Sequence, residues 1–311
     1  MRVFDAHCDV LYKMFLDSSI DFNDSEKLEV NLNGMKSGGI KVQCFAIFIP
    51  DSIHHEMRFN AALYMIELFY EKIIKTSPHL RLIKNRLDLD NLAEDEIGAI
   101  LTLEGCDAIG NDLIKLKTLL RLGVTSIGLT WNHSNYVADG ILEERGAGLS
   151  AFGKKVVSVL NTTQTWCDVS HLSERGFWDV IEYSDFPFAS HSNCYSLCPN
   201  PRNLTNDQIE ALIDRNSVIG ITFVTEFLSS RKSATVSDIV RHLEYVCSLG
   251  GEEHVGFGSD FDGNDGKLPK GIRNVKDFDY LINELVKYYS SKQVENFMHK
   301  NFFSRYPKYK D

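Results

Sequence analysis

The stretch RVFDAHCD, residues 2–9, places a short apolar run directly before His7 and Asp9, two side chains that can bind a metal ion. A short run of this kind is typical of a strand that is buried on both faces of a parallel sheet. The same arrangement recurs along the chain, so the sequence predicts eight strands. They cover residues 2–5, 42–49, 99–103, 126–130, 165–169, 186–189, 218–223 and 255–258.

Amphipathic segments separate these runs. Residues 59–75 carry apolar side chains at the spacing of a helix, and the segments that follow the later runs show the same pattern. Helices are therefore predicted at residues 59–75, 111–122, 148–161, 173–184, 205–215, 236–249, 275–289 and 291–304. The alternation predicts an α/β fold, a single (β/α)₈ TIM barrel domain over residues 1–311. An open doubly wound sheet is not favoured, because no glycine-rich phosphate-binding motif follows the first run.

The composition excludes several classes of protein. Of the 311 residues, 43% are hydrophobic and 24% are charged, which excludes a disordered or fibrous chain. The net charge is −10 and Lys and Arg form no long run, so we expect binding neither to nucleic acid nor to a membrane surface. The longest apolar stretch, residues 44–50, is far shorter than the ~18 residues of a membrane-spanning helix.

The cysteines and the start of the chain bear on the compartment. Seven cysteines are scattered along the sequence, a pattern that favours free thiols over a disulfide framework. The chain starts at Met1 and shows no apolar segment typical of a secretory signal. We therefore expect a cytoplasmic protein.

The ends of the predicted strands carry the chemistry. In a barrel of this kind the active site lies at the carboxyl ends of the strands. Each candidate taken alone is also consistent with a turn, a cap or a solvated surface residue. Because the candidates follow five of the eight runs, the set predicts one cluster of metal ligands and acid–base groups. The candidates are His7, Asp9, Glu104, His171, His191 and Asp260.

This set of side chains suits a pair of metal ions. Imidazole and carboxylate groups bind zinc, and they also bind manganese or cobalt. Glu104 has two carboxylate oxygens, so it can bridge two ions. We expect His7 and Asp9 to complete one site and His171 and His191 to complete the other. The positive charge that remains would favour a bound hydroxide, which is a nucleophile near neutral pH.

These motifs resemble those of the membrane dipeptidase (renal dipeptidase) family, the zinc peptidases of family M19 in the metal-dependent hydrolase superfamily. The resemblance implies a binuclear zinc dipeptidase that cleaves a small dipeptide with a hydroxide shared by the two ions. It further implies that Asp260 transfers the proton and that Arg202 binds the substrate carboxylate or the oxyanion. The motifs are Asp5-Ala6-His7-Cys8-Asp9, Glu104-Gly105, Asp168-Val169-Ser170-His171, Ser190-His191-Ser192-Asn193, Pro201-Arg202-Asn203-Leu204 and residues 258–263.

One segment departs from the family pattern. Many animal members carry a substrate-binding histidine in a Leu-Thr-His segment after the fourth strand, whereas this chain continues from Thr130 with Trp131. His133 lies two residues further along, on the same face of an extended strand, so it is a second candidate for substrate binding. Trp131 is consistent both with a wall of the substrate pocket and with ordinary barrel packing.

Two other functions stay open. Another metal-dependent amidohydrolase would act on a cyclic amide or a related small amide. Many such enzymes bridge their metals with a carboxylated lysine after the fourth strand, and residues 130–132 hold no lysine. A non-catalytic barrel that binds a ligand is the second alternative, and the uncommitted acid Asp260 argues against it. Members of the resembled family often form dimers, so a homodimer is compatible with the sequence.

Overall fold

The computed structural model describes residues 1–308, and eight parallel strands form its centre. Their order is β7-β6-β5-β4-β2-β1-β9-β8. Each of these strands overlaps a run predicted from the sequence. The strands are β1 Val3–Asp5, β2 Ile40–Phe48, β4 Ile97–Glu104, β5 Val124–Gly128, β6 Trp166–Asp168, β7 Pro187–Phe188, β8 Ile219–Ile221 and β9 Val255–Phe257.

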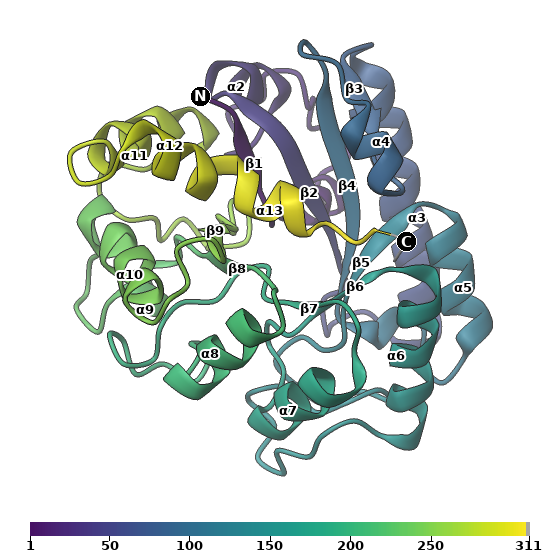
Figure 1. Cartoon of the computed structure of the whole chain (residues 1–311). Coiled ribbons are helices and arrows are strands. Elements are labelled where there is room, and N and C mark those ends of the chain that lie inside the picture. The colour runs from purple at the N-terminus through teal and green to yellow at the C-terminus, as the bar shows by residue number, and fades with distance from the viewer. Residues whose placement is uncertain (309–311) are drawn as a thin grey trace.

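The two ends of this strand order meet and close the ring. Ala189, directly after β7, forms a parallel bridge with Ile219 of β8. The amide of Ala189 donates to the carbonyl oxygen of Val218 at 3.1 Å, and the amide of Gly220 donates to the carbonyl oxygen of Ala189 at 2.8 Å. Figure 1 looks along the barrel and shows the helices outside the ring of strands. The predicted TIM-like barrel is confirmed.

One further strand, β3 Leu80–Leu82, is not predicted by the sequence pattern. It pairs in parallel with β4 between Ile97 and Ala99, whereas β5 pairs with β4 from Leu101 onward. The strand therefore extends the sheet only beside the first residues of β4. Its three residues are too few to show a clear apolar run, and its central residue is exposed.

Helices cover the outside of the barrel, as Figure 1 shows. All the predicted helical segments contain helices, and α3 continues into a π-helical turn at Phe69–Ile73. These helices are α3 Arg58–Leu68, α5 Leu113–Arg121, α6 Ala151–Thr163, α7 Glu174–Tyr183, α8 Asn206–Asp214, α10 Val236–Ser248, α11 Phe278–Leu285, α12 Ser291–Glu295 and α13 Asn301–Arg305. Shorter helices that the pattern does not predict are α1 Val10–Leu16, α2 Leu32–Ser37, α4 Arg86–Asp90 and α9 Thr225–Leu228.

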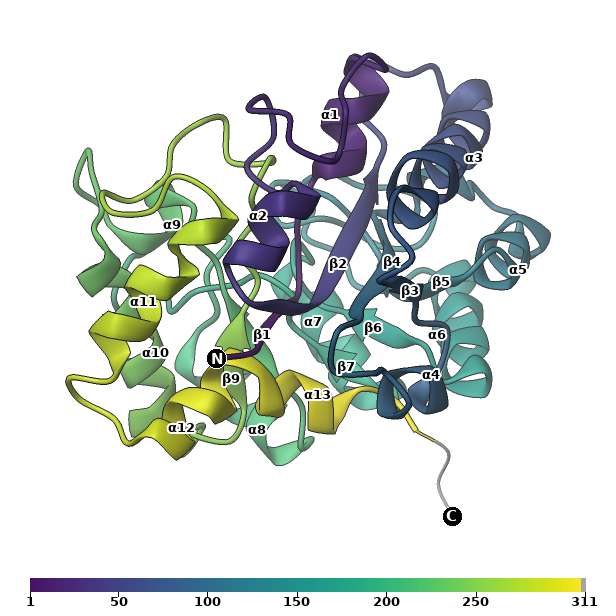
Figure 2. The same cartoon turned by 90° about the horizontal axis from the view of Figure 1, so that it is seen from above.

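Aromatic side chains fill the amino end of the barrel. Phe4 stacks on Phe302 with ring centroids 5.2 Å apart, and Trp166 stacks on Phe188 at 4.4 Å. Tyr306 meets the ring of Trp166 edge-on at 4.9 Å. Figure 2 shows α13, which carries Phe302, at one end of the barrel and α1 at the opposite end. Because side chains fill the amino end of the barrel, we expect a functional site at the carboxyl ends of the strands.

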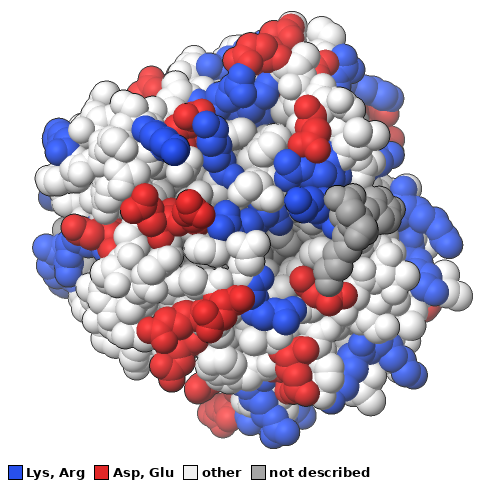
Figure 3. Space-filling model, in the orientation of Figure 1, with Lys and Arg blue, Asp and Glu red and all other residues white. Residues whose placement is uncertain are grey.

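The surface and the helices bear on the expected partners. Within residues 1–308, no helix is both long enough and apolar enough to cross a lipid bilayer. Figure 3 shows the face seen in Figure 1, where basic and acidic side chains are interspersed over the described residues. On that face, charges of one sign therefore do not gather into a single large field.

Candidate active site

The carboxyl ends of five strands bring the six predicted side chains into one cluster. Two of them follow β1, one ends β4, and the loops after β6, β7 and β9 supply one each. Their side chains are at most 13% exposed, so the cluster lies below the surface. The six are His7, Asp9, Glu104, His171, His191 and Asp260.

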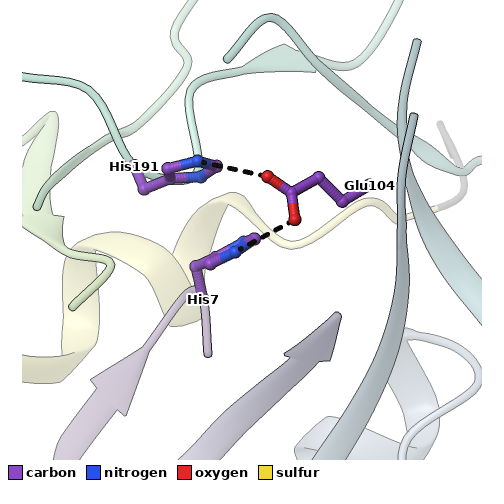
Figure 4. Close-up of side chains that lie close together, drawn as sticks. All are labelled: His7, Glu104 and His191. Atoms are coloured by element: carbon purple, nitrogen blue, oxygen red, sulfur yellow. Dashed lines mark ion pairs between the residues drawn. The ribbon is translucent and has the colours of Figure 1, made fainter. Parts of the chain in front are cut away.

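Glu104 lies between two groups of imidazole rings. Its Oε1 is 3.0 Å from Nε2 of His171 and 3.7 Å from Nε2 of His191. Its Oε2 is 3.6 Å from Nε2 of His7. Figure 4 shows the carboxylate between His7 and His191, with one oxygen directed toward each ring. The two oxygens of one side chain thus face different ring nitrogens, as a bridging ligand requires.

Hydrogen bonds to their outer ring nitrogens orient His171 and His191. Nδ1 of His171 lies 2.8 Å from Oδ1 of Asn132, an amide oxygen that can only accept. Nδ1 of His191 lies 2.6 Å from Oγ of Ser190, and this hydroxyl gives its own proton to the carboxylate of Asp168. Nδ1 of each ring therefore carries the proton, and Nε2 of each ring carries a lone pair.

The lone pairs of the two rings lie close together. The Nε2 atoms of His171 and His191 lie 2.9 Å apart, and Oε1 of Glu104 faces both. Burial holds the pKa of each ring well below its ordinary value of 6.5, so both rings are neutral at pH 7. Electron-rich atoms at these distances repel one another unless a cation lies among them. The donor set therefore fits a divalent metal ion.

The half of the cluster around His7 is acidic. Nε2 of His7 lies 3.3 Å from Oδ2 of Asp9 and 3.8 Å from Oδ1 of Asp260. Burial disfavours a charged ring, but the carboxylates of Glu104, Asp9 and Asp260 outweigh burial and raise the pKa of His7 to about 10. Burial raises the pKa of Glu104 well above its usual value and the pKa of Asp260 to about 7. Such a group of carboxylates favours positive charge, which a second metal ion would supply.

Two residues of the cluster have left-handed backbone conformations. The angle φ is 69° at His171 and 62° at Asp260. Such a conformation costs about 1–3 kcal/mol, and it persists where the surrounding structure enforces it.

The carboxylate of Asp262 accepts hydrogen bonds from the backbone N–H groups of Glu29 at 2.9 Å and Val30 at 3.1 Å. These bonds fasten the loop that carries Asp260 to the segment before α2.

Arg202 reaches the cluster from the loop between β7 and α8. Its guanidinium donates to the carbonyl oxygen of His191 at 3.2 Å and lies over the ring of Phe227. Only 6% of the residue is exposed, and its Nε has no hydrogen-bond partner within residues 1–308. Burial lowers the pKa of Arg202 to about 10, so the side chain is charged at neutral pH. A buried cation with an unused donor is suited to bind a carboxylate or an oxyanion.

The cluster opens into a cleft of about 560 Å³. Trp131 and Asn132 line this cleft beside His171. His133 is exposed and is not among the residues that line the cleft. The structure therefore brings Trp131 to the cluster and leaves His133 outside the cleft wall. A role of either residue in substrate binding stays a prediction.

Sequence reasoning missed three supporting residues: Asn132, Asp168 and Ser190. The backbone N–H groups of Ser170 and Ser190 also donate to Asp168, at 3.0 and 2.9 Å. Asp168 and Ser190 stand inside the quoted motifs, but their spacing along the chain does not show that they meet. The available signal is their nearness to predicted ligands, because Ser190 directly precedes His191 and Asp168 lies three residues before His171.

Comparisons with known sequences give a consistent result. The family model described as Membrane dipeptidase (Peptidase family M19) matches residues 1–307. An uncharacterized protein in the pqqA 5′ region of Klebsiella pneumoniae is 34% identical over 232 residues, which cover 71% of this chain and 85% of the relative. An uncharacterized dipeptidase of Schizosaccharomyces pombe is 28% identical and covers 96% of this chain, with 78% of its own length matched. Dipeptidase 3 of Mus musculus is 26% identical and covers 91% of this chain, with 59% of its own length matched.

Solved structures share the whole fold. A metallopeptidase from Rhodobacter sphaeroides, liganded with a phosphinate mimic of the dipeptide L-Ala-D-Ala, superposes with a TM-score of 0.92 at 26% identity and 98% coverage of both chains. The metallopeptidase called dipeptidase AC gives a TM-score of 0.92 at 27% identity, with 98% of this chain and 97% of that chain covered. Sequence and fold therefore point to the same group of proteins.

Proposed function

We propose that this chain, which belongs to the membrane dipeptidase family (peptidase family M19) and is thus a metallopeptidase, cleaves the peptide bond of dipeptides with a pair of divalent metal ions. The observation that carries this proposal is the position of Glu104. Its two oxygens face different imidazole groups, at 3.0 Å from His171 and 3.6 Å from His7. A single metal site would need only one of these oxygens.

Five side chains would hold the two ions. His7 and Asp9 would bind one ion, His171 and His191 would bind the other, and Glu104 would contact both. Two ions held there would supply Lewis acidity toward the peptide carbonyl and would lower the pKa of water enough to provide a nucleophile at neutral pH. Zinc suits this mixture of imidazole and carboxylate, and manganese or cobalt can bind the same ligands.

Asp260 is the acid–base residue in this proposal. Its carboxylate lines the cleft and is not one of the five proposed ligands, so in this proposal it accepts a proton from the attacking water. The same carboxyl group then returns the proton to the amine that leaves. The hydrogen bonds of Asp262 to Glu29 and Val30 hold the loop in place for this transfer.

Arg202 is the substrate-binding cation in this proposal. Its side chain lies near the cluster through its bond to the carbonyl oxygen of His191, and its buried Nε has no hydrogen-bond partner among residues 1–308. A guanidinium has paired N–H donors that match the two oxygens of a carboxylate. It would therefore bind the carboxylate at the end of the dipeptide or the oxyanion that forms during cleavage.

A substrate panel tests the proposed function. Protein stripped with a chelator and then reloaded with zinc, manganese or cobalt is assayed on L,L- and L,D-dipeptides, on tripeptides and on cyclic amides such as hydantoins. We expect dipeptide hydrolysis only by the reloaded protein, with little cleavage of tripeptides or cyclic amides. Turnover of cyclic amides without turnover of dipeptides would overturn the proposal in favour of another amidohydrolase.

A further inference from the structure

Two hollows border the cluster of proposed metal ligands, which we call the metal cluster, and His171 lines both of them. The first is the cleft described above, with a volume of about 560 Å³. The second, which we call the side chamber, has a volume of about 370 Å³ and is lined by Arg202, Leu172, Phe177 and Leu204 among others. A cluster that borders two spaces can accommodate the two residues of a dipeptide, one in each.

The charges of the two hollows differ. Arg202 lines the side chamber and is not among the residues that line the cleft. The side chamber also holds one carboxylate, the exposed Glu174, so the buried Arg202 balances its charge there. Two lysines lie on the cleft wall, and Lys267 is already paired with Glu226 at 2.5 Å. Apart from the proposed metal ligands, the cleft wall holds five carboxylates, at Asp51, Glu226, Asp260, Asp262 and Asp265.

A dipeptide has opposite charges at its two ends. Its carboxylate is attracted to Arg202 in the side chamber, and its ammonium group is attracted to the acidic cleft. This distribution of charge orients the substrate with its C-terminal residue toward the side chamber. The N-terminal residue and its side chain then lie in the cleft.

Three aromatic rings form one wall of the cleft, which we call the aromatic wall: Tyr12, Phe48 and Trp131. Tyr12 meets Phe48 edge-on with ring centroids 5.3 Å apart. Phe48 lies 5.1 Å from Trp131, and the ring of Trp131 lies 6.3 Å from the ring of His171. Trp131 therefore connects the wall to the metal cluster and lies beside the place where the N-terminal residue enters.

We propose that the aromatic wall binds the side chain of the N-terminal residue and makes the enzyme prefer dipeptides that begin with an aromatic or large apolar residue. The inference rests on the proposed dipeptidase function and adds the substrate class. Aromatic rings attract one another beyond the area that they bury, and a well-filled apolar pocket discriminates by about 10-fold or more. Trp131 is the specificity-determining residue, because it is the ring nearest the cluster.

Steady-state kinetics on matched dipeptides test this inference. We expect kcat/KM to be about 10-fold higher for L-Phe-Gly than for L-Ala-Gly, and higher for L-Phe-Gly than for Gly-L-Phe. In Trp131→Ala the advantage of L-Phe-Gly over L-Ala-Gly should largely disappear, mainly through KM. The matched control is Trp178→Ala on α7, since Trp178 lines neither hollow and is 38% exposed.

Equilibrium binding supplies a second readout that does not depend on turnover. Phosphinate mimics of L-Phe-D-Ala and L-Ala-D-Ala are titrated into metal-loaded wild type and into Phe48→Leu, which keeps an apolar side chain in the wall. The Phe mimic should bind about 10-fold more tightly to wild type, and the difference should shrink in the variant.

The outcomes separate this inference from the proposed function. Hydrolysis of dipeptides with no preference for an N-terminal Phe, or with a preference for Gly-L-Phe, overturns the inference and leaves the dipeptidase function standing. If the metal-loaded protein hydrolyses no dipeptide at all, both proposals are overturned. An unchanged Phe preference in Trp131→Ala overturns the role of Trp131.

Discussion

The hydroxyl of Ser190 lies 2.6 Å from Nδ1 of His191 and donates its own proton to Asp168. A hydroxyl has one proton to give, so Nδ1 of His191 must donate and Nε2 must carry the lone pair. The barrel fixes the position of Ser190 closely. A Cβ atom on Gly220 or Gly258 would stand 1.9 Å from the carbonyl oxygen of Ser190, so only glycine fits at either place.

Replacement of this hydroxyl should weaken metal binding. In Ser190→Ala the ring of His191 loses the acceptor that fixes its tautomer, and we expect metal affinity to fall about 10- to 100-fold. Competition against a chromogenic chelator measures the affinity. The control is Ser217→Ala, which removes another buried hydroxyl, bonded to Pro187, at the amino end of the barrel. Equal affinities for the two variants would show that the Ser190 hydroxyl does not support the site.

Removal of the proposed acid–base group should separate catalysis from metal binding. Asp260→Asn keeps the shape of the side chain but cannot accept the proton, so kcat should fall by about 100-fold or more. Metal content, measured by elemental analysis, should stay at the wild-type level. A variant with wild-type kcat would remove Asp260 from the mechanism, and a variant that loses a metal ion would make it a ligand.

A buried histidine away from the site should make stability depend on pH. His242 is 1% exposed, accepts from the amide of Cys194 at 3.0 Å and lies 3.0 Å from the carbonyl oxygen of Leu228. Burial lowers its pKa to about 4. Below about pH 6.5, His242 is protonated in the unfolded chain but stays neutral in the folded protein. The free energy of unfolding therefore decreases as the pH falls to about 4.

Urea unfolding at pH 7 and pH 5 measures this contribution. His242 should account for a loss of about 2 kcal/mol between the two pH values. His242→Gln should be less stable than wild type at pH 7 but should lose correspondingly less on acidification. The matched control is His54→Gln, which replaces an exposed histidine. The assignment is wrong if wild type and His242→Gln lose the same free energy between pH 7 and pH 5.

The barrel could be predicted because its strands are buried on both faces and follow one another at regular intervals. The runs at 99–103 and 255–258 show this clearly, since they contain only apolar residues and glycine or threonine. The strand β3 Leu80–Leu82 shows no such run, because Arg81 is exposed and the strand pairs only at the edge of the amino end. Short helices such as α1 have too few turns to display a helical spacing.

The cluster could be predicted for a different reason, namely that strand ends converge in a closed barrel. The hydrogen-bond partners of the histidine ring nitrogens could not be predicted, because they depend on contacts between loops. Asn132 and His171 come from the ends of different strands, yet they lie 2.8 Å apart. The positions of the residues after β5 could not be predicted either. The sequence alone was consistent with Trp131 or His133 beside the cluster.

The most direct measurement is the metal content of Glu104→Gln beside that of wild type, by elemental analysis after exhaustive dialysis. The amide that replaces the carboxylate is neutral and offers one weak oxygen donor instead of two charged ones, so the binding of both ions is weakened. We expect two equivalents per chain in wild type and a parallel loss of both in the variant. Retention of one full equivalent with loss of the other would contradict a shared carboxylate between the two ions.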